Sequence, residues 1–139
     1  MTNTWHEMTA LELGSGIANG DIDALDLAEH FLDRIEQQDT EHNIYIRATP
    51  ERARAEAAAA ADRARSGLRR GPLDGVPMSW KDLVAMAGEP TTGGSPLFAQ
   101  QPPATSDALL LSRATRAGMV CLGRTNLPEF AFSAMGINP

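Results

Sequence analysis

The sequence predicts an α/β fold built as a single domain over residues 1–139. Residues 1–70 are alanine-rich and mostly helical in pattern, and they hold 8 of the 11 Arg and 13 of the 18 Asp and Glu residues. Residues 71–139 are richer in Gly, Pro and apolar runs, and they contain a strand, a helix and a strand pattern in that order. Because this order favours parallel strands joined by a right-handed crossover, we predict a β-α-β-like second half.

Three helices are predicted in the first half. Thr9 and Glu12 form a capping-box pattern before an apolar stretch, and Gly20 is suited to end the helix that follows. The second helix covers residues 24–38, where apolar side chains recur every three or four residues. A short extended segment, residues 44–46, precedes the third helix. The remaining predicted caps and ends are Asp23 for the second helix, and Thr49, Pro50 and Gly67 for the third.

Two strands and one helix are predicted in the second half. Residues 76–81 form the first strand, and a helix capped by Ser106 runs to its closing glycine, Gly118. Residues 119–122 form a wholly apolar strand, which is typical of buried parallel strands. Two strands alone leave unpaired edges that invite association. We therefore expect the isolated chain to be poorly soluble or partly molten, and leave a homo-oligomer open.

Composition and motif content exclude several functional classes. A net charge of −6 argues against contact with nucleic acid, and no window approaches the ~18 apolar residues of a membrane span. The N-terminus lacks the basic residues of a signal peptide, so a cytoplasmic protein is expected. We predict no cofactor and no metal site, because nucleotide-binding glycine motifs are absent and the His residues are scattered. Cys121, the single cysteine, stands in an apolar run and is predicted to be a buried thiol.

Lys81, the only lysine, is the first candidate functional residue. It ends an apolar strand, at the kind of strand-to-loop corner where α/β sheets bind ligands. Base chemistry requires a neutral amine, and an ordinary lysine pKa of ~10.4 would have to fall by ~3 units. Asp82 need not oppose this, because successive strand residues point to opposite faces. From position alone, a structural lysine with its amine in solvent is the alternative to a catalytic one.

Three segments of the second half resemble the amidase signature family. Residues 71–83, Gly-Pro-Leu-Asp-Gly-Val-Pro-Met-Ser-Trp-Lys-Asp-Leu, are similar to its lysine motif. Residues 87–95 and 117–130 are similar to the blocks that follow, the latter containing Gly-Arg-Thr-Asn-Leu-Pro-Glu-Phe. The helices before them also resemble family openings, so the resemblance covers nearly the whole chain. Trp80 departs from the pattern, because an aliphatic residue is expected before the lysine.

The resemblance implies an amide hydrolase that uses a Ser–cis-Ser–Lys triad. It also implies the N-terminal portion of a mixed β-sheet covered by helices, as part of one amidase domain. By position Lys81 is the triad lysine, acting through a bridging serine on a nucleophilic serine that forms an acyl-enzyme. Backbone N–H groups would stabilise the oxyanion. Ala131, Phe132 and Ser133 match positions that line the substrate channel in some members, with ordinary packing after a turn as the alternative.

The chain departs from the family pattern at its end. In family members the block with the bridging serine follows the position of Pro139, and the nucleophile lies further on. The serines of this half do not lie in such a context: Ser79, Ser95, Ser106, Ser112 and Ser133. We therefore expect a truncated amidase chain that supplies only Lys81, and an isolated chain without activity. A small-molecule amide is the expected substrate once the domain is completed.

Two alternatives stay open at this point. The chain could be a non-catalytic fragment or interaction piece. It could also be the amidase subunit of a tRNA-dependent amidotransferase, which would need partner subunits.

Overall fold

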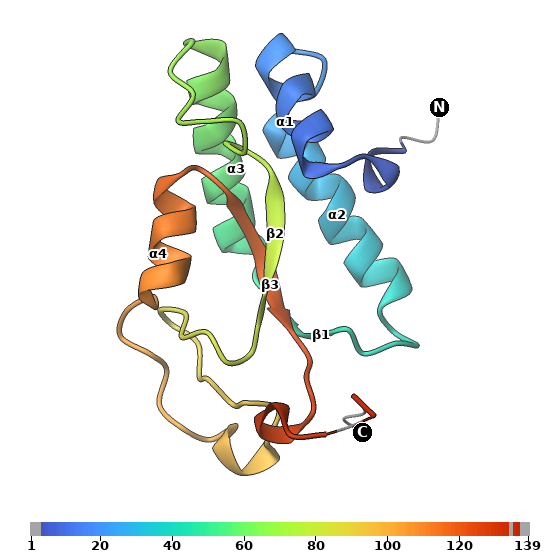
Figure 1. Cartoon of the computed structure of the whole chain (residues 1–139), viewed down its shortest axis with the longest axis vertical. Helices are drawn as coiled ribbons and strands as arrows, with labels where there is room; N and C mark the ends of the chain where they lie inside the picture. The colour runs from blue at the N-terminus through green and yellow to red at the C-terminus, as the bar shows by residue number, and fades with distance from the viewer. Residues whose placement is uncertain (1–3, 134, 137–139) are drawn as a thin grey trace.

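The computed structural model describes residues 4–133, 135 and 136; the remaining residues, Pro139 among them, lie outside the described part. Helices surround a small sheet, as Figure 1 shows, and the predicted α/β class is confirmed. In chain order the elements are η1 (Trp5–Glu7), α1 (Ala10–Asn19), α2 (Ala24–Gln38), β1 (Tyr45–Ala48), α3 (Pro50–Arg65), β2 (Pro77–Lys81), η2 (Pro96–Phe98), α4 (Leu109–Arg116), β3 (Val120–Thr125) and η3 (Glu129–Ala131), where η marks a 3-10 helix.

Strand β3 lies in the middle of the sheet, parallel to β2 and antiparallel to β1. The parallel pair is the predicted one, although β3 runs on to Thr125 because its last residues still pair with the end of β2. The extended segment predicted at residues 44–46 overlaps β1, which begins one residue later and makes the sheet mixed. Gly123 permits this pairing, because a Cβ atom there would lie 2.4 Å from the Arg47 carbonyl oxygen.

Helices cover both faces of the sheet. Helices α2 and α3 pack on β3 through one apolar cluster, which includes Leu32, Ala57 and Leu122. Helix α4 packs on the opposite face, where Leu111 joins a second cluster with Trp80. Figure 1 shows α4 and α2 on opposite sides of the strands. Within the described residues, no helix is long and apolar enough to cross a membrane.

The predicted side-chain caps form at the first two helices but not at α3, where Thr49 and Pro50 still occupy the predicted positions. Thr9 and Glu12 form a complete capping box, and the Asp23 carboxylate accepts hydrogen bonds from the first turn of α2. Thr49 precedes α3 as predicted, but its side chain makes no cap. Its hydroxyl instead donates to the Cys121 carbonyl at 3.4 Å. A long-range acceptor in β3 has therefore replaced the local one.

Helix α4 begins later than the sequence predicts. It starts at Leu109, and Ser106 is not its cap. The segment before the helix is bound to the loop that follows β2: the Ala108 N–H donates to the Ala85 carbonyl at 2.9 Å. The Asp107 carboxylate also accepts from the Ala87 N–H at 2.8 Å. These contacts hold the segment extended, so the helix forms only after them.

Cys121 is buried, as predicted from its apolar neighbours. Burial raises the pKa of its thiol to about 11. At neutral pH the group is therefore an uncharged core thiol and a poor nucleophile.

Gly118→Ala is expected to lower the free energy of unfolding by about 3 kcal/mol, measured by urea denaturation. Gly118 has a φ of +92°, and a Cβ atom there would lie 2.0 Å from an Asp74 carboxylate oxygen. Gly67→Ala is the matched control, because Gly67 has a φ of +68° with open space around it. That variant should lose only about 1 kcal/mol, from backbone strain alone. Equal losses in the two variants would refute the packing argument.

Candidate functional site

Lys81 is the last residue of β2 and lies beside Thr125, the last residue of β3. Its side chain is exposed, and the Nζ amine donates to the Asn126 carbonyl oxygen at 3.2 Å. The sequence therefore places Lys81 correctly at a strand-to-loop corner. Among the described residues, no carboxylate lies within ion-pair distance of this amine.

A cavity of about 470 Å³ opens beside Lys81. The segment before β1 and the segment after β3 form its walls, and the Asn126 N–H donates to the Ile44 carbonyl at 2.6 Å where the two meet. The lining residues are His42, Asn43, Ile44, Lys81, Thr125, Asn126, Leu127, Pro128 and Gly136. A small polar ligand could therefore reach the lysine amine from solvent.

Asp82 points away from Lys81, as strand geometry predicts. Its side chain is buried and forms an ion pair with Arg124 of β3, which is also buried. Thr92 donates to the same carboxylate from both its backbone N–H and its hydroxyl. The negative charge next to Lys81 in sequence is thus neutralised on the other face of the sheet.

The structure does not bring Ala131, Phe132 and Ser133 to Lys81. They lie at and after η3, and they are absent from the described lining of the Lys81 cavity. The Phe132 side chain is 93% exposed. The Ser133 hydroxyl oxygen accepts from the Met135 N–H at 3.2 Å. Their role in substrate binding stays a prediction.

Ser79 lies two residues before Lys81 and on the same face of β2. Its hydroxyl is paired with the Tyr45 hydroxyl at 2.5 Å, across the side-chain-free position of Gly123 in β3. Burial raises the pKa of Tyr45. Ser79 is therefore bound within the sheet, and nothing in its contacts marks it as a nucleophile.

Sequence reasoning missed the buried ion pair of Asp82 and Arg124. The one visible signal was Arg124 itself, a charged residue two positions after an apolar run in a buried strand. A buried charge requires a partner, but the sequence does not say which residue supplies it.

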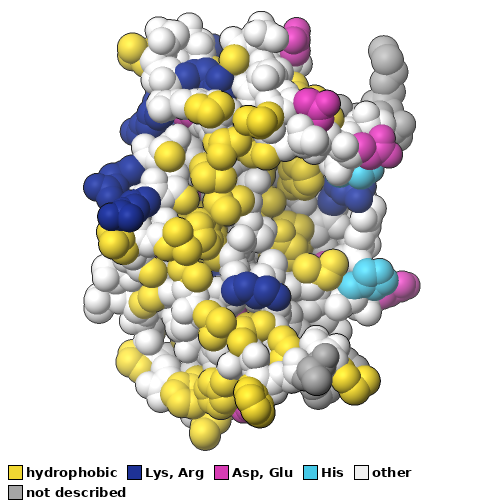
Figure 2. Space-filling model, in the orientation of Figure 1, with side chains coloured by type: hydrophobic (Ala, Val, Ile, Leu, Met, Phe, Trp, Pro, Cys, Tyr) yellow, Lys and Arg dark blue, Asp and Glu magenta, His cyan; other side chains and the backbone are white. Residues whose placement is uncertain are grey.

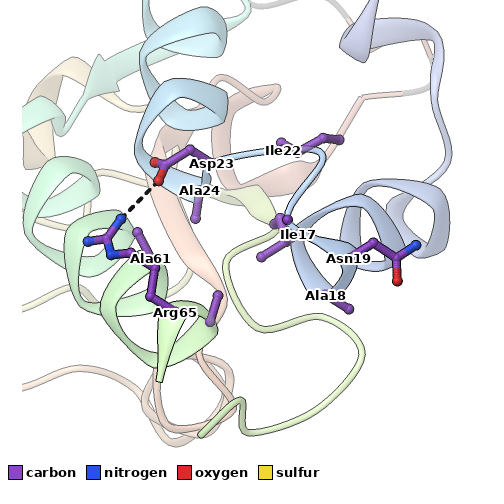
Figure 3. Close-up of a pocket in the computed structure, with 10 residues that line it drawn as sticks. Ile17, Ala18, Asn19, Ile22, Asp23, Ala24, Ala61 and Arg65 are labelled. Carbon is purple, nitrogen blue, oxygen red and sulfur yellow. Dashed lines mark hydrogen bonds and ion pairs between the residues drawn. The ribbon is translucent and has the colours of Figure 1, made fainter. Parts of the chain in front are cut away.

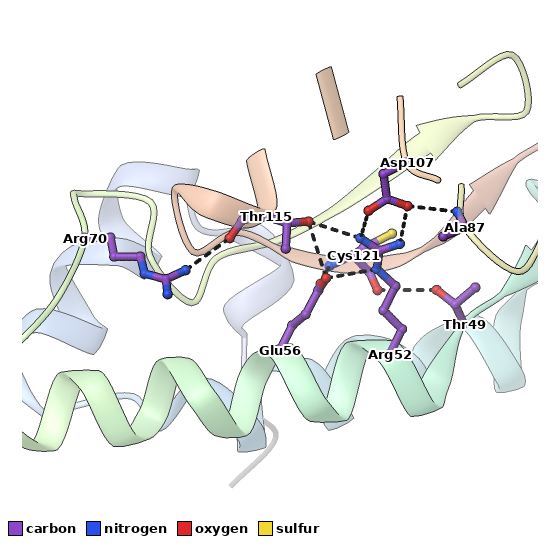
Figure 4. A network of polar contacts seen from close by, with 8 residues as sticks. All are labelled: Thr49, Arg52, Glu56, Arg70, Ala87, Asp107, Thr115 and Cys121. Carbon is purple, nitrogen blue, oxygen red and sulfur yellow. Dashed lines mark hydrogen bonds and ion pairs between the residues drawn. The ribbon is translucent and has the colours of Figure 1, made fainter. Parts of the chain in front are cut away.

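A second polar network, also unpredicted, joins α3 to β3 and to the segment before α4. Figure 4 shows Arg52 between Glu56 and Asp107, with Asp107 also bound to the Ala87 N–H. Glu56 in turn accepts from the Cys121 N–H at 2.8 Å. The network fixes the loop after β2 against α3 and β3.

Another cavity, of about 310 Å³, lies among α1, α2 and α3. Figure 3 shows the ion pair of Asp23 and Arg65 to one side of apolar side chains such as Ile17. The two charged groups are 3.1 Å apart. Apart from this ion pair, the described lining of the cavity holds no charged side chain. Across the described residues, no group of three or more His, Cys, Asp or Glu side chains could hold a metal ion.

Comparison with known proteins places these features in context. The family model named Amidase matches residues 26–139. A glutamyl-tRNA(Gln) amidotransferase subunit of Thioalkalivibrio sulfidiphilus is 40% identical over 129 residues, covering 93% of this chain and 26% of the relative. The corresponding subunit of Chloroflexus aurantiacus is 37% identical over 130 residues, with 93% and 26% covered.

Solved structures give the same picture. The peptide amidase of Stenotrophomonas maltophilia superposes with a TM-score of 0.83 at 33% identity, covering 91% of this chain and 26% of that one. A structure described as a vestigial protein complex, which reveals the origins of an s-triazine catabolic enzyme, has a TM-score of 0.85 at 40% identity. There the coverage is 88% of this chain and 27% of the other. The chain spans about a quarter of the length of the relatives it matches.

Proposed function

The chain belongs to the amidase signature family, and we propose that it supplies Lys81 as the catalytic lysine of an amide hydrolase. One observation carries the proposal: the Lys81 amine opens on the cavity at the carboxyl ends of two parallel strands, bound to a carbonyl oxygen. Ligands of open α/β sheets bind at this edge. A carboxylate beside the amine would favour its charged form, and none is within ion-pair distance among the described residues.

The proposed reaction needs groups beyond those of this chain. A nucleophilic serine attacks the amide carbonyl carbon, and its proton passes through the bridging serine to the neutral Lys81 amine. The tetrahedral intermediate then expels the amine product, which takes up a proton, and leaves an acyl-enzyme that water hydrolyses. By family resemblance both serines lie beyond the segment that this sequence matches. Lys81 is thus a proton acceptor and donor, and the 139-residue chain is expected to be inactive alone.

Complementation tests this proposal. We expect no hydrolysis of a nitroanilide amide by the 139-residue chain, and hydrolysis when it is co-expressed with the unmatched three-quarters of the S. maltophilia peptide amidase. Lys81→Met should lower the restored rate by about 10³-fold or more, because the proton acceptor is lost. Arg113→Met, at an exposed position of α4, is the control and should retain the rate.

Three results would count against the proposal. Turnover by the 139-residue chain alone would show that no further segment is needed. Restored activity that survives Lys81→Met would remove the lysine from the mechanism. Persistent inactivity of the complemented protein would favour the non-catalytic alternative.

A second candidate is the amidase subunit of a tRNA-dependent amidotransferase. It is favoured by several sequence relatives that are glutamyl-tRNA(Gln) amidotransferase subunits, at 36–40% identity. With a net charge of −6 this segment is poorly suited to contact tRNA, so partner subunits would bind the tRNA. The completed protein would then act on glutamyl-tRNA(Gln) only with those partners, whereas a free amidase hydrolyses amides without them.

The interaction-piece alternative has its own supporting observation. Exposed apolar side chains gather around η2 and η3, at the lower end of the molecule in Figure 2. They are Leu97, Phe98, Phe130, Phe132 and Met135. Such a surface suits contact with another polypeptide, whether the rest of an amidase domain or a further copy of this chain.

A further inference from the structure

Arg124 is the largest fully buried side chain of the described residues. It lies on β3 beside Trp80 of β2, and its guanidinium pairs with Asp82. Within the described part of the chain, its Nε and Nη1 atoms have no hydrogen-bond partner. A guanidinium with unused buried donors is far from an optimal stabilising group. The pair is therefore poorly explained by stability alone.

Asp82 connects four segments that meet next to Lys81, namely β2, β3, the loop at residues 92–93 and η3. Its N–H donates to the Thr125 carbonyl at 3.1 Å, which is the last link between β2 and β3. Its carbonyl accepts from the Gly93 N–H at 2.9 Å, and its carboxylate binds Thr92 and Arg124. Gly93 in turn accepts from the Phe130 N–H at 2.7 Å, which ties in η3.

These contacts surround the lysine contact described above. Lys81 directly precedes Asp82, and Asn126, whose carbonyl accepts from the Lys81 amine, follows Arg124 by two residues. The ion pair therefore joins β2 and β3 at the level where Lys81 and its acceptor leave the sheet. Any slip of one strand end against the other would separate the amine from that carbonyl.

We propose that Asp82 and Arg124 are positioning residues, whose buried pair holds the Lys81 amine at the Asn126 carbonyl and so aims it into the cavity. The inference rests on the proposed function of Lys81, and it adds the residues that act through it. Neither side chain touches the cavity itself. Their contribution is to set where the amine stands.

The single lysine makes a direct test possible. Labelling the full 139-residue chain with ¹³C,¹⁵N-lysine gives side-chain NMR signals from Lys81 alone. In Arg124→Met we expect these signals to move towards those of a free lysine side chain. In a second sample, labelled uniformly with ¹⁵N, the amide of Asp82 should exchange with solvent at least about tenfold faster, because its strand end has lost the ion pair.

A second ion pair, between the buried Asp74 carboxylate and the partly exposed Arg63 guanidinium, supplies the control. Arg63→Met breaks the pair of Arg63 and Asp74, at the opposite end of β2 from Lys81. We expect this variant to be destabilised while the Lys81 signals stay in place. If the Lys81 signals move equally in both variants, the Arg124 pair only stabilises the fold and the proposal is wrong. Unmoved Lys81 signals in Arg124→Met would also overturn the proposal.

A milder variant decides the case if Arg124→Met does not fold. Thr92→Val removes one hydroxyl donor from the Asp82 carboxylate and leaves both charges of the pair. It should move the Lys81 signals in the same direction by a smaller amount, and unmoved signals would refute the proposal. These measurements need no amide hydrolysis. The positioning role of Asp82 and Arg124 is therefore tested separately from the catalytic role of Lys81.

Discussion

Asp74→Asn is expected to lower the free energy of unfolding by about 3 kcal/mol at neutral pH, measured by urea denaturation. The Asp74 side chain is fully buried in the loop between α3 and β2. It accepts from Arg63 Nε at 3.0 Å and Arg63 Nη2 at 2.5 Å, and from the Arg70 N–H at 2.8 Å. An asparagine keeps the volume but leaves the Arg63 charge without its partner and turns an NH₂ group towards other donors.

The lowered pKa of Asp74 supports the same expectation. Burial opposes the charged form and is the largest single influence, yet the Arg63 and Arg70 hydrogen bonds prevail and hold the pKa of Asp74 below its ordinary value of 3.8. A carboxyl whose pKa falls on folding stabilises the protein above the unfolded value and loses that contribution as pH falls through the folded one. The pair is therefore net stabilising at neutral pH.

Asp23→Asn makes the matched control for this prediction. Asp23 also pairs with an arginine, Arg65, but its side chain is 37% exposed and that of Arg65 is 63% exposed. Asparagine caps a helix about as well as aspartate does, so the start of α2 is preserved. We expect a loss below about 1 kcal/mol, as for other surface pairs. If both substitutions lower the free energy of unfolding by the same amount, burial is not what makes the Asp74 pair strong.

The parts of the fold that the sequence predicts are those encoded by neighbouring residues. The spacing of apolar side chains over residues 24–38 matches α2, and the apolar run at residues 119–122 marks β3. Lys81 is placed correctly because it ends a strand. Each of these predictions needs only a short window of sequence, in which the periodicity or the boundary is visible.

The failures have a common physical cause, which is competition from partners far away in the chain. Thr49 has the sequence of a cap, but a carbonyl of β3 binds its hydroxyl. Ser106 fails because its segment is tied to the loop after β2. Asp82 and Arg124 are 42 positions apart, so no local pattern shows that they pair. Tertiary contacts of this kind decide caps and buried charges, whereas periodicity decides the elements themselves.

Asp107→Asn is expected to cost about 2–3 kcal/mol of unfolding free energy at pH 7, and the difference from the original chain should shrink as the pH falls below 3.8. Arg52 binds both oxygens of the Asp107 carboxylate, at 2.9 and 2.7 Å, and the Ala87 N–H adds a third donor. The Arg52 hydrogen bond, helped by that of Ala87, holds the pKa of Asp107 below its usual value in spite of burial. Because the folded pKa is the lower one, the stabilisation is present above the unfolded pKa and is lost on protonation in acid.

Urea denaturation of both proteins between pH 7 and pH 3 measures this difference directly. Glu29→Gln is the control, because Glu29 pairs with Arg54 at the surface, where the two side chains are 37% and 50% exposed. Its loss should stay below about 1 kcal/mol across the range. A cost of Asp107→Asn that stays constant from pH 7 to pH 3 would show that the charge of Asp107 is not what holds Arg52. The loop after β2 would then be fixed by backbone contacts, such as the hydrogen bond from the Ala108 N–H to the Ala85 carbonyl.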